Sequence, residues 1–139
     1  MKRDGPQVIF SFLLVVTAVI ALSCASSPRA LNSVSVNPAT AHAQAAGGQV
    51  QFTATGYYSA PPSPITPAPA LWEACYQGGL TTGVVVNSSG LAQCTGSPAT
   101  YEVTAFVPNP AFRGACSQVV LPCGGSCGGS VGTAQLTCQ

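Results

Sequence analysis

The sequence predicts an all-β sandwich held together by disulfides, on three observations. Short segments alternate apolar and polar residues, which is the period of a half-buried strand. Turn residues recur between these segments, and no stretch of more than about ten residues shows a helical period. Cysteines are frequent, seven in 139 residues. We expect about seven short strands, a number typical of a two-sheet sandwich of this length.

The first half of the domain contains three predicted strands. Ser33–Pro38 alternates valine with serine and ends at a proline, and Gln49–Gly56 shows the clearest alternation in the chain. Tyr57–Ala70 holds five prolines and is expected to be an extended loop, because proline removes a backbone donor. Leu71–Cys75 is the next short strand.

The second half contains a predicted hairpin and two longer strands. Thr82–Val86 and Leu91–Cys94 flank an Asn-Ser-Ser-Gly turn. Thr100–Val107 alternates with tyrosine, valine and alanine on one face. A loop rich in glycine and cysteine, residues 109–130, then leads to the last strand, Gly132–Cys138.

The order of these motifs resembles the bacterial immunoglobulin-like domains of group 2, which occur in intimin- and invasin-type surface proteins. The matching segments are SVSVNPATA, GGQVQFTATG, a tryptophan opening the third strand, VVVNSSGLAQ and ATYEVTA, and they cover Leu31 to Val107. The resemblance implies an immunoglobulin-like sandwich over residues 32–139 and display at a surface. It transfers no catalytic residue. The long proline loop and the cysteines depart from the family pattern.

Residues 1–23 are predicted to be a signal peptide. Lys2 and Arg3 precede Val8–Leu22, which is apolar except for a serine and a threonine and is shorter than the ~20 residues of a membrane-spanning helix. Ala21-Leu22-Ser23-Cys24 resembles a bacterial lipobox, which would make Cys24 the acylated first residue and residues 24–31 a tether. Cleavage after Ala25 and an uncleaved anchor are the alternatives. We expect a lipoprotein of the outer membrane or cell surface, or a secreted protein if Cys24 is not lipidated.

From residue 24 onward the chain carries very few charges. They are two arginines and two glutamates, with no lysine and no aspartate, so the formal net charge is zero. Nucleic-acid binding is excluded because it needs lysine or arginine to neutralise phosphates. The charged residues are Arg29, Glu73, Glu102 and Arg113.

Apart from Cys24, six cysteines suit a disulfide framework in an exported domain. We expect Cys75 to pair with Cys94, because both end short strands, and Cys123 with Cys127 and Cys116 with Cys138. A zinc site built from the last four is the disfavoured alternative, because the chain has no CxxC pair and exported thiols oxidise.

The sequence offers little for catalysis. Two GxSxG matches, around Ser126 and Ser130, lack the flanking strand and helix of a hydrolase. His42 is the single histidine, and nothing in the sequence brings Glu73 and Glu102 together for glycoside chemistry. We therefore expect no enzyme, no cofactor and no metal.

The expected function is a non-catalytic module, anchored in the cell envelope, for adhesion, envelope structure or assembly. Its partners would be the membrane, through the N-terminal lipid, and an envelope protein or glycan. One alternative is a carbohydrate- or peptide-binding module, and another is a small disulfide-rich protease inhibitor. The aromatic residues that could face a ligand are Tyr57, Tyr58, Trp72 and Tyr76.

Overall fold

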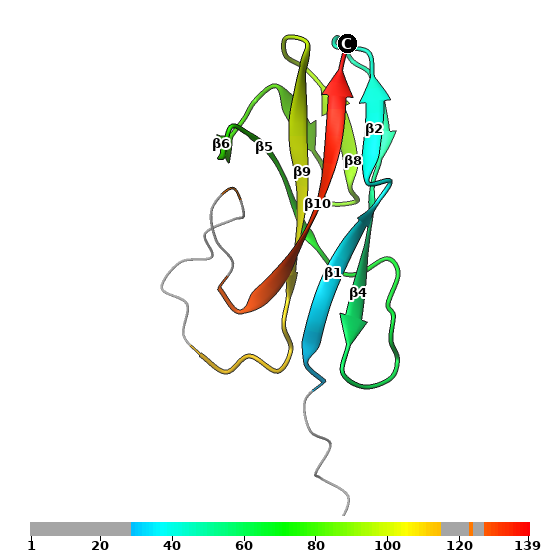
Figure 1. The fold of residues 1–139 in the computed structure, drawn as a ribbon, viewed down its shortest axis with the longest axis vertical. Coiled ribbons are helices and arrows are strands. Elements are labelled where there is room, and N and C mark those ends of the chain that lie inside the picture. Colours follow the sequence, from blue (N-terminus) through cyan, green and yellow to red (C-terminus); the bar gives the residue numbers. More distant parts are fainter. Residues whose placement is uncertain (1–28, 115–122, 124–126) are drawn as a thin grey trace, which may run out of the picture.

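The computed structural model describes residues 29–114, 123 and 127–139, and these form an all-β, sandwich-like structure (Figure 1). The predicted signal peptide, Cys24 and most of the tether lie outside the described residues. Within the described part of the chain, no helix is long and apolar enough to cross a membrane. Ten strands are present there: β1 (Leu31–Asn37), β2 (Thr40–Ala43), β3 (Gln49–Gln51), β4 (Thr53–Tyr58), β5 (Leu71–Tyr76), β6 (Gly79–Leu80), β7 (Val84–Val86), β8 (Leu91–Cys94), β9 (Ala99–Pro108) and β10 (Gly129–Cys138).

The strands form one five-stranded sheet and two smaller sheets. The large sheet has the order β2-β10-β9-β5-β6, and the smaller ones have the orders β1-β4 and β3-β8-β7. Since only Phe52 separates β3 from β4, the two smaller sheets are joined by one almost continuous strand. Phe52 itself is fully buried in the core.

The core lies on the alternating face that the sequence indicates. In β9 the side chains of Tyr101, Val103, Ala105 and Val107 are buried, and in β10 those of Ala134 and Leu136 are buried with them. The two strands pair antiparallel over their whole length, from Gly129 opposite Pro108 to Cys138 opposite Ala99. The predicted strands at Thr100–Val107 and Gly132–Cys138 are therefore confirmed, and each extends beyond its predicted start.

β9 is also buried on its second face, which the alternation does not indicate. Thr104 is fully buried and Phe106 is 5 % exposed, although both point away from the core face. The ring of Phe106 lies against Gly129, where a β-carbon would come within 2.5 Å of it. The middle of β9 therefore behaves as a strand covered on both sides.

The first strand passes from one sheet to the other. β1 pairs antiparallel with β4 and ends at Asn37, where the predicted proline stop falls and the Asn37–Pro38 peptide is cis. β2 then pairs parallel with β10. The sequence did not predict β2, because its half-buried side chains are small alanines that give little hydrophobic signal. Together with β6 and the break at Phe52, β2 raises the strand count above the expected seven.

The disulfide pairing differs from the expected one. Cys75 of β5 is bonded to Cys123, and Cys94 of β8 is bonded to Cys138 of β10. The predicted pairs Cys75–Cys94, Cys123–Cys127 and Cys116–Cys138 are therefore wrong. Cys127 is also disulfide-bonded, while Cys116 lies outside the described residues. The physical reason is topological: β8 and β10 belong to different sheets that face each other, so their last residues meet across the core.

Candidate functional site

A groove of about 610 Å³ opens beside Trp72, on the edge of the sandwich. Its walls come from four parts of the chain: Phe52 with the start of β4, the end of the proline loop where it runs into β5, the turn between β7 and β8, and the end of β9. The residues lining it are Phe52, Thr53, Ala54, Pro67, Ala68, Pro69, Ala70, Leu71, Trp72, Ser88, Ser89 and Pro108.

Trp72 is held in place by β5 and by a glycine. It sits opposite Ala105 in the β5–β9 pairing. Gly90 has a φ of +84°, and a β-carbon there would lie 2.9 Å from Cζ2 of the indole and 2.5 Å from the carbonyl oxygen of Phe52. Only glycine therefore allows the ring to lie this close to the β7–β8 turn. Trp72 is half-buried, so it contributes both to the core and to the groove.

The turn that carries the two serines is fixed by side-chain hydrogen bonds. Oδ1 of Asn87 accepts from the backbone N–H of Ser89 (2.9 Å) and of Leu91 (3.0 Å). Nε2 of Gln51 donates to the carbonyl oxygens of Phe52 and Ser89, each at 2.7 Å. These bonds place Ser88 and Ser89 at the rim of the groove in a defined position.

The opposite wall is the proline loop, which adds to the free edge of β4. Gly56 and Ile65 exchange two backbone hydrogen bonds, at 3.0 and 2.9 Å, and the N–H of Ala68 donates to the carbonyl of Ala54 at 2.8 Å. The loop thus runs beside β4 like an extra edge segment, as its prolines permit only at an edge. This brings Pro67 and Pro69 to the groove.

The groove has the chemistry of a site for a neutral ligand. The lining residues include no charged side chain, and their polar side-chain groups are the hydroxyls of Thr53, Ser88 and Ser89 and the indole N–H of Trp72. Leu71, at 47 % exposed, adds an apolar surface beside the indole. An aromatic face with hydroxyls at its rim suits a ligand that has both an apolar face and hydrogen-bonding groups.

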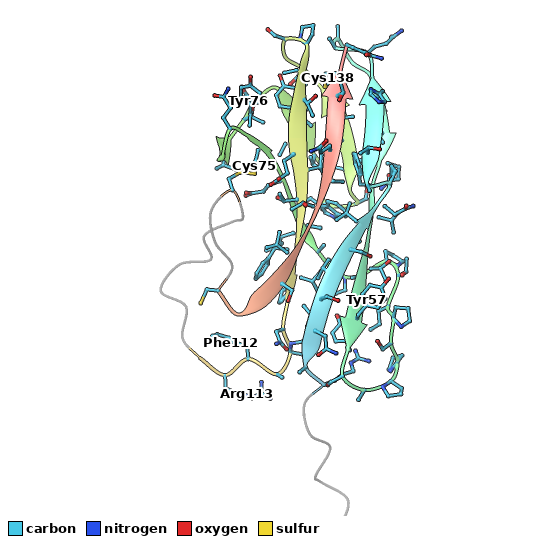
Figure 2. All side chains as sticks on the ribbon, viewed as in Figure 1. Tyr57, Cys75, Tyr76, Phe112, Arg113 and Cys138 are labelled. Carbon is cyan, nitrogen blue, oxygen red and sulfur yellow. A yellow bond between two sulfur atoms is a disulfide. The ribbon has the colours of Figure 1, made fainter. Side chains whose placement is uncertain are left out.

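The aromatic residues proposed as ligand-facing do not form one platform. Tyr57 and Tyr76 are exposed, but they lie at opposite ends of the molecule (Figure 2). Tyr58 is 8 % exposed and its ring is covered by the guanidinium of Arg29, 4.4 Å from the ring centroid. Tyr76 packs against the buried Tyr101 with ring centroids 5.4 Å apart. Only Trp72 of the predicted set lines the groove.

The register brings Glu73 and Glu102 closer than the sequence indicates. Glu73 lies opposite Thr104 and Glu102 opposite Cys75, so the two carboxylates occupy diagonal positions on the same face of the sheet. Oε2 of Glu73 is buried without a hydrogen-bond partner, and this burial raises the pKa of Glu73. Glu102 lines a separate hollow of about 310 Å³ that Glu73 does not reach, so the two share no cavity for a substrate.

The described residues contain no group of three or more histidine, cysteine, aspartate or glutamate side chains that could hold a metal. Cys123, Cys127 and Cys138 of the alternative zinc site are all disulfide-bonded, which removes their thiolates as ligands. His42 is exposed on β2, and Ser126 lies outside the described residues.

No protein-family model matches the chain, and a search of curated proteins finds no match. The sequence indicated Trp72 but not the walls around it, because residues 52–54, 88–89 and 108 meet Trp72 only when the sheets pack.

Proposed function

We propose that the chain is an exported, non-catalytic immunoglobulin-like module, anchored in the cell envelope through a lipid on Cys24, that serves adhesion, envelope structure or assembly. The strand order is the observation that supports an immunoglobulin-like fold. One layer reads β1-β4/β3-β8-β7 and the other β10-β9-β5-β6, which correspond in chain order to strands ABED and GFCC′ of the immunoglobulin arrangement.

The passage of the first strand between layers supports the same assignment, because β1 joins one layer and β2 the other. The segments that resemble the group 2 bacterial immunoglobulin-like domains overlap β1, β3, β4, β7, β8 and β9. The disulfide between the layers differs from that of antibody domains, because it joins β8 to β10 instead of strands B and F.

Export is supported by the disulfides, because such bonds form and persist in oxidising compartments. Anchoring is supported by the lipobox-like sequence that ends at Cys24. Multiple acyl chains bind a membrane stably, where a single chain binds only reversibly.

The anchor is tested by expressing the full chain in a bacterium fed radiolabelled palmitate, and by intact-mass measurement of the purified product. We expect label and an acyl mass in the wild type, retention in the membrane fraction, and loss of all three in Cys24→Ala. Ser27→Ala, in the same tether, is the matched control and should behave as wild type. An unlabelled, soluble wild-type product would refute anchoring.

A second candidate function is binding of a neutral glycan in the groove beside Trp72. The half-buried indole and the two serine hydroxyls at the rim support it, because sugars present both an apolar face and hydroxyl groups. The test is a titration of Trp72 fluorescence, the single tryptophan of the chain, with neutral oligosaccharides. We expect a saturable change that Ser88→Ala with Ser89→Ala weakens and Tyr57→Ala leaves unaltered. A flat titration across an oligosaccharide panel would rule this function out.

A further inference from the structure

Both arginines of the domain lie at one end of the molecule, where the chain enters. We call Arg29, Phe112 and Arg113 the basal surface. Figure 2 shows Phe112 and Arg113 at the end opposite Cys138. The two glutamates are placed away from this end, Glu73 opposite Thr104 and Glu102 opposite Cys75 in the β5–β9 sheet. The domain is therefore neutral overall but positive at its basal end.

Hydrogen bonds join the parts of this end into one unit. Oδ1 of Asn109 accepts from the backbone N–H of Leu31 (3.1 Å) and of Ala111 (3.0 Å), and its carbonyl accepts from the N–H of Phe112 (3.0 Å). The entry of the chain and the turn that carries Phe112 and Arg113 are thus held by the same asparagine.

Arg29 is also fixed by the domain. Its Nη1 donates to the carbonyl of Pro62 at 2.9 Å, and its guanidinium covers the ring of Tyr58. Nη1 of Arg113 donates to the carbonyl of Pro110 at 3.1 Å. Because these partners are neutral carbonyls, both guanidinium charges are left to interact with an anionic surface.

An apolar aromatic side chain is exposed at this end beside Arg113. Phe112 is 42 % exposed and rests on Gly128, where a β-carbon would lie 2.6 Å from Cδ1 of the ring. An aromatic ring at the same end as cationic groups is the composition that favours the boundary between lipid headgroups and acyl chains.

The distance to the membrane is short if Cys24 carries a lipid. Five residue steps separate Cys24 from Arg29, and a fully extended chain covers at most about 18 Å over them. Arg29, fixed to the domain, is thus held within that distance of Cys24, the residue that would carry the acyl chains. The basal surface adjoins this entry point, because Asn109 joins the turn that carries Phe112 and Arg113 to Leu31.

We propose that the basal surface docks on the anionic phospholipid headgroups of the bilayer that holds the Cys24 lipid, so that the C-terminal end of the sandwich points away from the membrane. This inference rests on the proposed lipid anchor. Docking by two arginines is too weak to hold a free domain, but the tether keeps them at high local concentration.

The test uses the full lipidated chain in nanodiscs, with a paramagnetic gadolinium chelate on the lipid headgroups and NMR of the backbone amides. On discs that contain phosphatidylglycerol we expect strong relaxation enhancement at Phe112 and Arg113 and little at Leu80 and Gln139. Arg113→Gln should lower the ratio of docked to undocked molecules about fivefold, the effect of about one charge near an anionic surface. Leu80→Ser, at an exposed apolar residue outside the basal surface, is the matched control and should change nothing.

Three outcomes are distinguishable. Selective enhancement at the basal surface that weakens on phosphatidylcholine discs supports the proposal. Equal enhancement at both ends, from a chain whose mass includes the lipid, overturns the docking and leaves the anchor intact. A chain whose mass lacks the lipid overturns the anchor and the docking with it.

Discussion

Oδ1 of Asn109 accepts a hydrogen bond from the backbone N–H of Leu31, which lies 78 residues earlier in the chain. The same oxygen accepts from Ala111, so one side chain joins the start of β1 to the turn after β9. Leu31 is buried and begins the first strand. The asparagine therefore stabilises the end of the sandwich at which the chain enters.

Asn109→Ala should lower the free energy of unfolding by about 1–3 kcal/mol, because two backbone donors lose their acceptor in a partly buried place. Thermal unfolding measures the loss, and hydrogen exchange should accelerate at the Leu31 amide. Asn109→Asp keeps an acceptor oxygen at this position and is the matched control. A similar loss in both variants would mean that the oxygen is not the stabilising group.

Replacing both cysteines of the Cys94–Cys138 disulfide by alanine should lower the free energy of unfolding by about 4 kcal/mol. The reason is that the bond closes a long loop in the unfolded chain. Urea denaturation measures the change. Cys75→Ala with Cys123→Ala removes a loop of similar length, so its entropic cost is expected to be the same. The free energy of unfolding should nevertheless fall further when the Cys94–Cys138 bond is removed, because both of its cysteines are fully buried whereas Cys123 is not. A larger loss from the second pair would contradict this ranking.

The strands could be predicted where one face is clearly apolar. Val103, Ala105 and Val107 recur at every second position of β9, and the core uses that face. β2 was not predictable in this way, because Ala41 and Ala43 bury little apolar surface and the strand depends on backbone pairing with β10.

The disulfides and the groove depend on contacts between sheets, which local pattern does not contain. Cys94 and Cys138 end strands in different layers, and six cysteines permit fifteen pairings. Trp72 could be recognised as a candidate from its type alone. The groove wall that the proline loop forms could not be predicted, because the loop is held there by its backbone hydrogen bonds to Gly56 and Ala54.

Glu73→Gln should stabilise the protein at neutral pH and have little effect near pH 4. Burial raises the pKa of Glu73, so the folded state holds this proton more tightly than the unfolded state does. The free energy of unfolding therefore falls as pH rises from the unfolded pKa, about 4.3, through the raised folded one. In Glu73→Gln the free energy of unfolding should not show this decrease with rising pH. Thermal unfolding as a function of pH measures both curves.

Glu102→Gln is the control for this prediction, because Glu102 is exposed on the neighbouring strand. Glu73 is intact in this variant, so its free energy of unfolding should still fall as pH rises. If Glu73→Gln also follows the wild type between pH 4 and 7, the buried oxygen of Glu73 is not the source of the pH dependence.

Gly90→Ala should destabilise the protein more than Gly78→Ala, although both glycines have nearly the same positive φ, +84° and +80°. The backbone cost of alanine in this conformation, about 1 kcal/mol, is common to the two variants. At Gly78 a β-carbon meets nothing within 4 Å, whereas at Gly90 it meets the Phe52 carbonyl and the indole of Trp72. The difference between the two urea midpoints therefore measures the close contacts of the β7–β8 turn with the Phe52 carbonyl and the indole of Trp72. The fluorescence emission of Trp72 should shift in Gly90→Ala but not in Gly78→Ala, because the added methyl group displaces the ring. If the two variants are equally destabilised and the emission does not shift, the turn moves and the ring of Trp72 does not.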